Sequence, residues 1–240
     1  MWLISNKTLV SDSGIFEDFC DCHCHLLPGV DDGIKKQEDA LYILDQWELL
    51  GVEEVWMTPH VMEDIPNETM DLTERFKSFC SAYTGQLRLH LAVENMMDGL
   101  FLQRLDERDL LPLGMSGIQL LVETSYFNPP MGMEDIVRKI KEAGYTPVLA
   151  HPERYQYMDM EHYMKWKNAG MLFQLNIPSL VGAYGIDVQK KAEMLLSKNM
   201  YDCSGTDIHS VQAMNFMLNS KISKKTVKAV KQISEKLPKF

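Results

Sequence analysis

The sequence predicts an α/β protein that folds as a distorted seven-stranded (β/α)7 barrel of the TIM-like kind. Short β-like runs alternate with amphipathic stretches along almost the whole chain, which is typical of parallel strands joined by crossover helices. Gly51, Gly144 and Gly170 each follow a helical stretch and precede a strand, where a left-handed C-cap is favoured. The length of 240 residues suits one barrel domain. A doubly wound open sheet is the competing arrangement, and either one places a site at the carboxyl ends of the strands.

Seven runs rich in apolar and β-branched residues are expected to form the strands. They cover residues 19–25, 54–58, 88–94, 119–124, 146–151, 172–176 and 200–206. Amphipathic stretches between and after them are expected to form the helices. These cover residues 36–50, 67–84, 99–107, 133–143, 160–168, 187–198, 211–218 and 223–235.

The chain divides into an N-terminal extension, residues 1–17, and one barrel domain, residues 18–240, because no repeat or Gly/Ser linker marks a second domain. The extension carries apolar side chains, namely Trp2, Leu3, Ile4, Ile15 and Phe16. We expect it to pack against the barrel, with contacts in a homo-oligomer as the alternative.

Composition excludes several classes of function. The net charge of -10 disfavours nucleic acid and anionic lipid, unless a metal cluster supplies local positive charge. No apolar run approaches the roughly 20 residues of a membrane span, and no signal peptide is recognisable, so we expect a cytoplasmic protein without membrane insertion. The five cysteines suit reduced thiols, and none has an arginine six positions later, which excludes a phosphatase with a cysteine nucleophile.

The first predicted strand carries an H-x-H motif, His23 and His25, near its carboxyl end. Because side chains alternate along a strand, Asp21, His23 and His25 are expected on one face, with Cys22 and Cys24 on the other. Both imidazoles can then reach one metal ion, while the two thiols are expected to pack as small apolar groups. The loop that follows holds Asp31 and Asp32 before Gly33, which is either an Asp-Gly turn or a source of ligands.

Six of the seven predicted strands end in histidine, aspartate or glutamate. Beyond the first strand, these residues are His60, Glu94, Glu123, His151, Asp207 and His209. Scattered surface residues would not gather at strand ends in this way, so the pattern predicts a metal site with several ions. Mixed imidazole and carboxylate ligands suit manganese, iron or zinc at a catalytic centre, whereas a closed structural zinc site favours thiolates. His90 and His162 lie outside the pattern and are expected at the surface or in the core.

These motifs resemble the polymerase-and-histidinol-phosphatase (PHP) superfamily, and within it the bacterial CpsB-type tyrosine phosphatases encoded beside capsule and exopolysaccharide genes. The resemblance extends from about residue 18 to the carboxyl terminus. It rests on D-x-H-x-H at residues 21–25, V-D-D-G at 30–33, T-P-H at 58–60, Glu94, Glu123, A-H-P-E-R-Y at 150–155 and D-I-H at 207–209.

The resemblance implies three divalent ions, usually manganese, in the mouth of a PHP-type barrel. It assigns His23, His25, Glu94 and Asp207 to the first ion. Glu94 bridges to a second ion, which Glu123 and His151 also hold, and Asp32, His60 and His209 hold the third. It further implies a protein-tyrosine phosphatase that acts on a phosphotyrosine protein, a bacterial exopolysaccharide autokinase.

Hydrolysis by a metal-activated water needs no protein nucleophile. Arg154 can add a bidentate contact to phosphate, and we expect it to act in catalysis with Asp207 and His209. Asp21 is expected to orient an imidazole rather than to bind metal. Some relatives carry a further arginine after the last motif, but residues 210–214 contain none. The alternatives are a phosphatase for a small metabolite such as histidinol phosphate, and a catalytically idle barrel that holds metal and binds a phosphoprotein.

Overall fold

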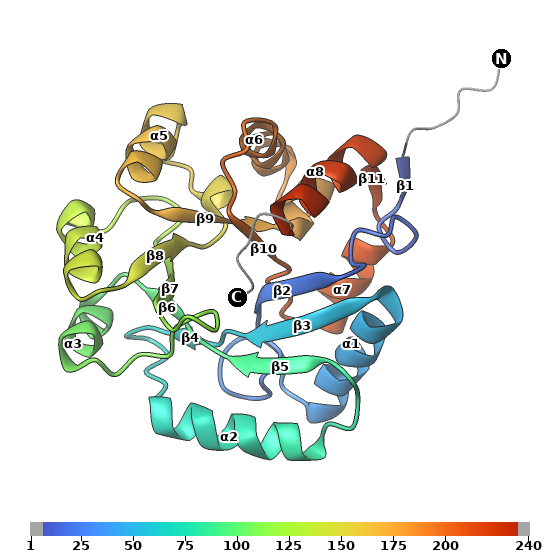
Figure 1. Cartoon of the computed structure of the whole chain (residues 1–240), viewed down its shortest axis with the longest axis horizontal. Coiled ribbons are helices and arrows are strands. Elements are labelled where there is room, and N and C mark those ends of the chain that lie inside the picture. The colour runs from blue at the N-terminus through green and yellow to red at the C-terminus, as the bar shows by residue number, and fades with distance from the viewer. Residues whose placement is uncertain (1–6, 235–240) are drawn as a thin grey trace.

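The computed structural model describes residues 7–234 of the chain (Figure 1). Trp2, Leu3 and Ile4 of the predicted extension lie outside the described residues, as does the end of the last predicted helix. Ile15 and Phe16 are buried in the core. The division of the chain between residues 17 and 18 stays a prediction.

The largest sheet has six parallel strands in the described chain. In spatial order they are β10 (Cys203–Gly205), β9 (Leu172–Asn176), β8 (Thr146–Leu149), β7 (Gln119–Glu123), β6 (Glu94–Met96) and β4 (His60–Val61). A second, three-stranded parallel sheet contains β2 (Phe19–Cys24), β3 (Val52–Met57) and β5 (Arg88–Leu91). The short strands β1 (Lys7–Leu9) and β11 (Lys221–Ser223) pair antiparallel with each other.

The predicted closed seven-stranded barrel is wrong, because the described residues form a curled six-stranded sheet and a separate three-stranded one. Two of the predicted strands are interrupted. Thr58 and Pro59 separate β3 from β4, and Ala92 and Val93 separate β5 from β6. Pro59 has no N–H to donate to a ladder, although its carbonyl accepts a hydrogen bond from the Glu94 N–H at 3.1 Å. The two halves of each interrupted strand therefore belong to different sheets.

The edge between β2 and β10 is joined by side chains. The Asp21 carboxylate accepts hydrogen bonds from the backbone N–H (2.8 Å) and the hydroxyl (2.6 Å) of Thr206. The Cys22 thiol donates to the Ser204 carbonyl at 2.9 Å. Gly205 lies so close to β2 that a Cβ atom there would be 2.6 Å from Cβ of His23. Backbone hydrogen bonds just beyond β10 also join this edge, from Thr206 (3.1 Å) and Asp207 (2.6 Å) to the His23 carbonyl, but β2 and β10 form no regular ladder.

An irregularity in β2 changes the expected alternation of its side chains. The pairing of β2 with β3 shifts between Asp21 and Cys24, so that β2 contains one residue more than its partner. Cys22 consequently packs in a small inner cluster with Trp56 and Cys203, whereas Cys24 packs in the main core. The expectation that both thiols share a face is therefore wrong, although both pack as apolar groups.

Helices cover the outside of both sheets and agree closely with the predicted stretches (Figure 1). They are α1 (Gln37–Leu50), α2 (Thr69–Ala82), α3 (Gly99–Glu107), α4 (Met133–Glu142), α5 (Met160–Asn168), α6 (Ile186–Ser197), α7 (Val211–Leu218) and α8 (Lys224–Ser234). Two 3-10 turns, η1 (Pro152–Arg154) and η2 (Ile177–Val181), follow β8 and β9. In the part of the chain described here, no helix combines the length and apolar character that crossing a membrane requires.

The main core lies between the sheets and the helices, and the inner cluster lies on the opposite face of the strands. On β7, for example, Leu120 and Val122 belong to the main core, while Leu121 belongs to the inner cluster. Glu123 shares the face of Leu121 because the two are separated by one residue. The inner face of the curled sheet thus leads from an apolar layer to the polar side chains at its carboxyl edge.

Candidate metal centre

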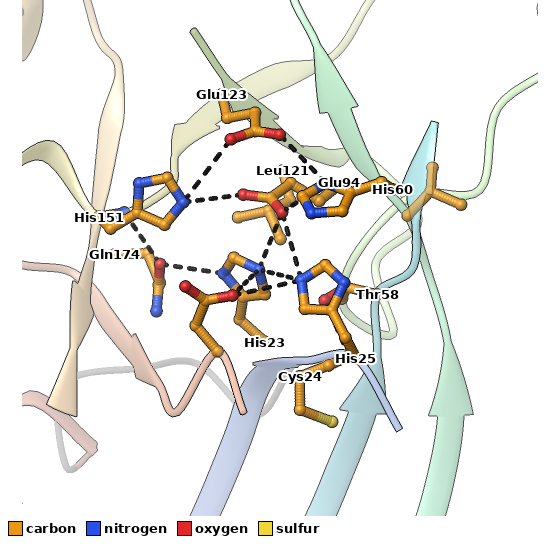
Figure 2. A network of polar contacts seen from close by, with 12 residues as sticks. His23, Cys24, His25, Thr58, His60, Glu94, Leu121, Glu123, His151 and Gln174 are labelled. Atoms are coloured by element: carbon orange, nitrogen blue, oxygen red, sulfur yellow. Dashed lines mark hydrogen bonds and ion pairs between the residues drawn. The ribbon is translucent and has the colours of Figure 1, made fainter. Parts of the chain in front are cut away.

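Polar side chains converge where the strands of the two sheets end (Figure 2). All nine residues predicted as metal ligands lie there. Eight of them form three overlapping groups, in each of which the ligand atoms lie within 4.8 Å of one another. The ninth, His151, contacts Glu94 directly. The nine are His23, His25, Asp32, His60, Glu94, Glu123, His151, Asp207 and His209. The interruptions of the strands bring His60 and Glu94 side by side at the start of β4 and β6.

Glu94 occupies the centre of the cluster, between imidazoles from both sheets (Figure 2). Its Oε2 atom is 3.2 Å from Nε2 of His23 and 3.3 Å from Nε2 of His25. On the other side of these two nitrogens, Oδ1 of Asp207 is 3.3 Å from each. The two nitrogens are themselves 3.1 Å apart. These four side chains are the set predicted for the first ion.

A second group of ligand atoms lies on the side of β7. Nδ1 of His60 is 3.1 Å from both Glu94 and Glu123. Nε2 of His151 is 3.0 Å from Oε1 of Glu94 and 3.9 Å from Oε2 of Glu123. The prediction joined Glu94 and Glu123 with His151, and the structure brings His60 to the same carboxylates.

The third group opens toward solvent. Asp32, whose side chain is 66% exposed, is 3.4 Å from Nε2 of His60 and 3.4 Å from Nε2 of His209. The ring of His25 stacks on that of His209, with centroids 3.9 Å apart, and belongs to this group as well. His25 and His60 therefore each lie in two groups, and the assignment of ligands to individual ions stays a prediction.

Three of the five imidazoles are oriented by hydrogen bonds on the nitrogens that face away from the cluster. Nδ1 of His25 donates to the Asp31 carboxylate at 2.7 Å, and Nδ1 of His23 donates to the Gln174 amide oxygen at 3.3 Å. Nδ1 of His209 donates to the Asp207 carbonyl at 2.9 Å. In each ring Nε2 is thereby left with its lone pair toward the other ligand atoms.

Burial and neighbouring charges set the protonation of the cluster. Burial lowers the pKa of His151 to about 4, with help from Arg154, so this imidazole is neutral at pH 7. Burial also acts on Asp207, but the nearby imidazoles and Arg154 outweigh it and hold the pKa of this carboxyl well below its usual range. Burial and the charge of Glu94 raise the pKa of Glu123. Burial also acts on three more imidazoles, but the carboxylates outweigh it and raise the pKa values of His23, His25 and His60.

This donor set fits bound cations better than a network of hydrogen bonds. Nδ1 of His60, Oε2 of Glu94 and Oε1 of Glu123 are buried and have no hydrogen-bond partner in the described structure, although they lie close together. Buried polar atoms of this kind are costly unless something else satisfies them. Imidazole nitrogens and carboxylate oxygens at such spacing are ligands that divalent transition ions accept.

Arg154 and Asp21 each contact a residue of the cluster. Nη1 of Arg154 donates to Oδ2 of Asp207 at 2.5 Å, which places the predicted phosphate-binding side chain next to the ligand atoms. Asp21 accepts from Thr206 and from the backbone N–H of His23 at 3.3 Å. Burial raises the pKa of Asp21 to about 6, against these hydrogen bonds. Its contact with His23 is through the backbone, whereas Asp31 is the carboxylate that holds an imidazole.

Sequence reasoning missed Gln174 and Asn176 on β9 as neighbours of the site. Gln174 accepts hydrogen bonds from His23 and from the backbone N–H of His151, and Asn176 donates to Asp207 at 3.0 Å. A signal was present, because the two amides alternate at the carboxyl end of a predicted strand. Amides are weaker indicators of metal chemistry than acids and imidazoles, so this strand was the only one without an assigned ligand.

Comparisons with known proteins identify relatives of this chain. Residues 19–237 match the family model described as capsular polysaccharide synthesis, CpsB/CapC. CapC of Staphylococcus aureus is 26% identical over 216 residues, which cover 87% of this chain and 84% of CapC. The tyrosine-protein phosphatase YwqE of Bacillus subtilis is 25% identical over 202 residues, which cover 82% of this chain and 79% of YwqE.

A solved structure shows the same fold. The match comes from work on YwqE from Bacillus subtilis and CpsB from Streptococcus pneumoniae, described there as unique metal-dependent tyrosine phosphatases. It has a TM-score of 0.70 at 23% identity and covers 91% of this chain and 87% of the solved one. The family model spans most of the sequence, from the first strand of the site to beyond the last ligand motif. The chain therefore belongs to the CpsB/CapC family of capsular polysaccharide synthesis.

Proposed function

We propose that this protein is a metal-dependent protein-tyrosine phosphatase that hydrolyses phosphotyrosine monoesters in the regulation of capsule synthesis. The observation that carries the proposal is the largely buried cluster of five imidazoles and four carboxylates, in a chain whose relatives are named tyrosine-protein phosphatases. The substrate we propose is phosphotyrosine on a bacterial tyrosine autokinase, in the cytoplasm.

The proposed cofactor is three divalent ions, with manganese first and iron or zinc as the other choices. The three overlapping groups of ligand atoms support this number, and the mixed nitrogen and oxygen donors support this class of metal. Divalent ions held in such a cluster neutralise phosphoryl oxygens and acidify a water molecule enough for it to be the nucleophile at neutral pH.

The protein's own groups have distinct tasks in this proposal. Asp31 and Gln174 hold His25 and His23 in the tautomer that turns Nε2 inward. Arg154, whose side chain is 15% exposed, supplies N–H donors beside the cluster for the oxygens of a phosphate group. Asp207 and His209 border the same space, with Nδ1 of His209 3.5 Å from Oδ1 of Asp207. No serine or cysteine nucleophile is needed, because water attacks phosphorus.

Phosphatase assays on the purified chain test the proposal. The protein, loaded with manganese, is offered an aryl phosphate, a phosphotyrosine peptide and histidinol phosphate side by side, with and without a chelator. We expect the aryl phosphate and the peptide to be hydrolysed, histidinol phosphate to be a much poorer substrate, and the chelator to abolish turnover.

Other outcomes would contradict the proposal in different ways. Faster turnover of histidinol phosphate would indicate a phosphatase for a small metabolite. Bound metal and affinity for the phosphopeptide without any turnover would indicate an idle binding protein. Full activity in the presence of the chelator would exclude metal dependence.

A further inference from the structure

Arg154 lies between two tyrosine rings that the predicted ligand set does not include. The carbon at the centre of its guanidinium is 4.6 Å from the ring centroid of Tyr126 and 4.2 Å from that of Tyr184. Nη2 of Arg154 also donates a hydrogen bond to the Tyr126 hydroxyl at 2.6 Å. The three side chains come from three separate loops, which follow β7, β8 and β9.

Local backbone structure holds both tyrosines in place. The Tyr126 carbonyl accepts a hydrogen bond from the Gln156 N–H at 2.8 Å, which fastens the loop after β7 to the segment just beyond Arg154. Tyr184 lies in a turn between Gly182 and Gly185, whose positive φ angles of 80° and 93° favour glycine. Backbone hydrogen bonds from Ala183 to Pro178 (3.2 Å) and from Gly185 to Gly182 (3.1 Å) close this turn.

The geometry restricts how Arg154 can point. A guanidinium is planar, stacks on aromatic rings through its faces and donates hydrogen bonds only from its edge. With two tyrosine rings beside its central carbon, and with Asp207 and Tyr126 accepting from two of its edge donors, the group has few orientations left. Its remaining N–H groups are fixed relative to the metal centre.

Asp207 connects Arg154 and its neighbours to the candidate metal centre. Oδ2 of Asp207 accepts from Arg154 and from Nδ2 of Asn176, while Oδ1 faces the imidazoles of the cluster. Nδ2 of Asn176 is also 3.4 Å from the Tyr184 hydroxyl, to which it donates. Oδ2 of Asp207 is thus held by Arg154 and Asn176. Tyr126 contacts Arg154, and Tyr184 contacts both.

We propose that Tyr126 and Tyr184 are positioning residues that clamp Arg154 for recognition of the substrate's phosphate group. The clamp acts through Arg154, so its loss weakens phosphate binding without removing any metal ligand. This inference rests on the proposed phosphatase function for its meaning in catalysis, but the binding of phosphate itself can be measured independently.

The experiment compares matched tyrosine variants of the full chain loaded with manganese. Tyr126→Leu and Tyr184→Leu remove the rings, whereas Tyr126→Phe removes only the hydrogen bond to Arg154 and Tyr184→Phe only the one from Asn176. The control is Tyr42→Leu, which removes an exposed tyrosine of α1. Its side chain makes no hydrogen bond in the described structure. Affinity for inorganic phosphate is measured by calorimetry, together with metal content, melting temperature, and kcat and KM for an aryl phosphate.

We expect each leucine variant to weaken phosphate binding about tenfold, with a matching rise in KM and unchanged metal content. Tyr126→Phe should lose about fivefold, Tyr184→Phe should lose less than Tyr184→Leu because it keeps the ring, and Tyr42→Leu should bind as the wild type does. In a double-mutant cycle, Arg154→Lys with Tyr184→Leu should bind phosphate no more weakly than Arg154→Lys alone, because the tyrosine acts through the arginine.

The inference is overturned if both leucine variants bind phosphate as tightly as the wild type, or if the double variant shows fully additive losses. A wild type that binds no phosphate would overturn it as well. If the wild type binds phosphate but hydrolyses no ester, the proposed function fails while the binding data still decide the clamp. If a leucine variant does not fold, the decision rests on Tyr126→Phe, which must lose affinity relative to Tyr42→Leu.

Discussion

The buried imidazoles of His23 and His25 each make one hydrogen bond on the nitrogen that faces away from the other ligand atoms. Gln174 is the partner with the most connections, since its amide oxygen accepts both Nδ1–H of His23 and the backbone N–H of His151. One side chain on β9 thereby holds two predicted ligands from two other strands. Such partners tune metal affinity nearly as strongly as the ligands themselves.

Replacing Gln174 by alanine should weaken metal binding by about 10- to 100-fold and lower activity in proportion, because His23 loses its orientation. Titration of the metal-free protein with manganese measures the effect. The control is Gln86→Ala, which alters an exposed side chain with no hydrogen bond in the described chain. Equal manganese affinity in the two variants would contradict this role for Gln174.

His209→Ala should lower metal content and turnover together, by at least about tenfold in turnover. His209 is the choice because its side chain is 30% exposed, so its removal leaves little empty space in the core. His162→Ala alters an exposed histidine of α5 and should retain both properties. Metal analysis and an aryl phosphate assay on the same preparations check the result, and full metal occupancy with normal turnover would remove His209 from the centre.

At the level of residues, the acids and imidazoles of the candidate site could be predicted from the sequence. The residues that orient them through hydrogen bonds or ring contacts could not. A histidine at a strand end has few structural uses, so His60 and His151 could be singled out from the sequence. Tyr126 and Tyr184 look like ordinary loop aromatics, because their meaning depends on Arg154 standing between them. Only the spatial arrangement supplies that information.

Among the elements, the predicted bounds of the helices agree with the structure more closely than those of the strands. Three predicted helices, 99–107, 160–168 and 211–218, have the observed bounds, because side-chain caps at Asp98, Asp159 and Ser210 mark where they begin. The strand interruption at Pro59 and the irregularity in β2 depend on neighbouring strands, so apolar patterns alone could not locate them. The closed barrel was mistaken for this reason.

Gly205→Ala tests the close contact between β10 and β2. An added Cβ would lie 2.6 Å from Cβ of His23 and 2.8 Å from the His23 nitrogen, so β2 must shift with its imidazole. We expect a lower melting temperature and less bound metal. Gly99→Ala is the matched control, since its Cβ would meet only the flexible end of the Glu63 side chain. If Gly205→Ala keeps wild-type metal content and melting temperature, the contact is looser than its geometry indicates.

In the molecule as a whole, the candidate metal centre lies where the two sheets meet. His23 comes from the three-stranded sheet, whereas His60, Glu94 and Glu123 come from the six-stranded one. The backbone hydrogen bonds that join the sheets lie at one edge, where the N–H groups of Thr206 (3.1 Å) and Asp207 (2.6 Å), just beyond β10, donate to the His23 carbonyl of β2. Bound ions would therefore link the two sheets as well as serve catalysis.

Removing metal should lower the melting temperature of the whole protein. An ion that binds only the folded state stabilises it by about 3 kcal/mol at a free concentration one hundred times its dissociation constant. Thermal unfolding with manganese and with a chelator measures the shift, and His209→Ala should show a smaller one. Identical melting temperatures with and without manganese would contradict a role for the ions in joining the sheets.

The hydrogen bonds from Thr206 to Asp21 span 185 positions of the chain. During translation, the segment with Asp21 and the first two imidazoles leaves the ribosome long before Thr206 and Asp207 are made. A nascent polypeptide that ends before Thr206 and Asp207 has an incomplete set of predicted ligands. Its Asp21 carboxylate also lacks the two hydrogen bonds from Thr206. Capture of metal by the full set of predicted ligands would thus have to wait until residue 209 has been synthesised.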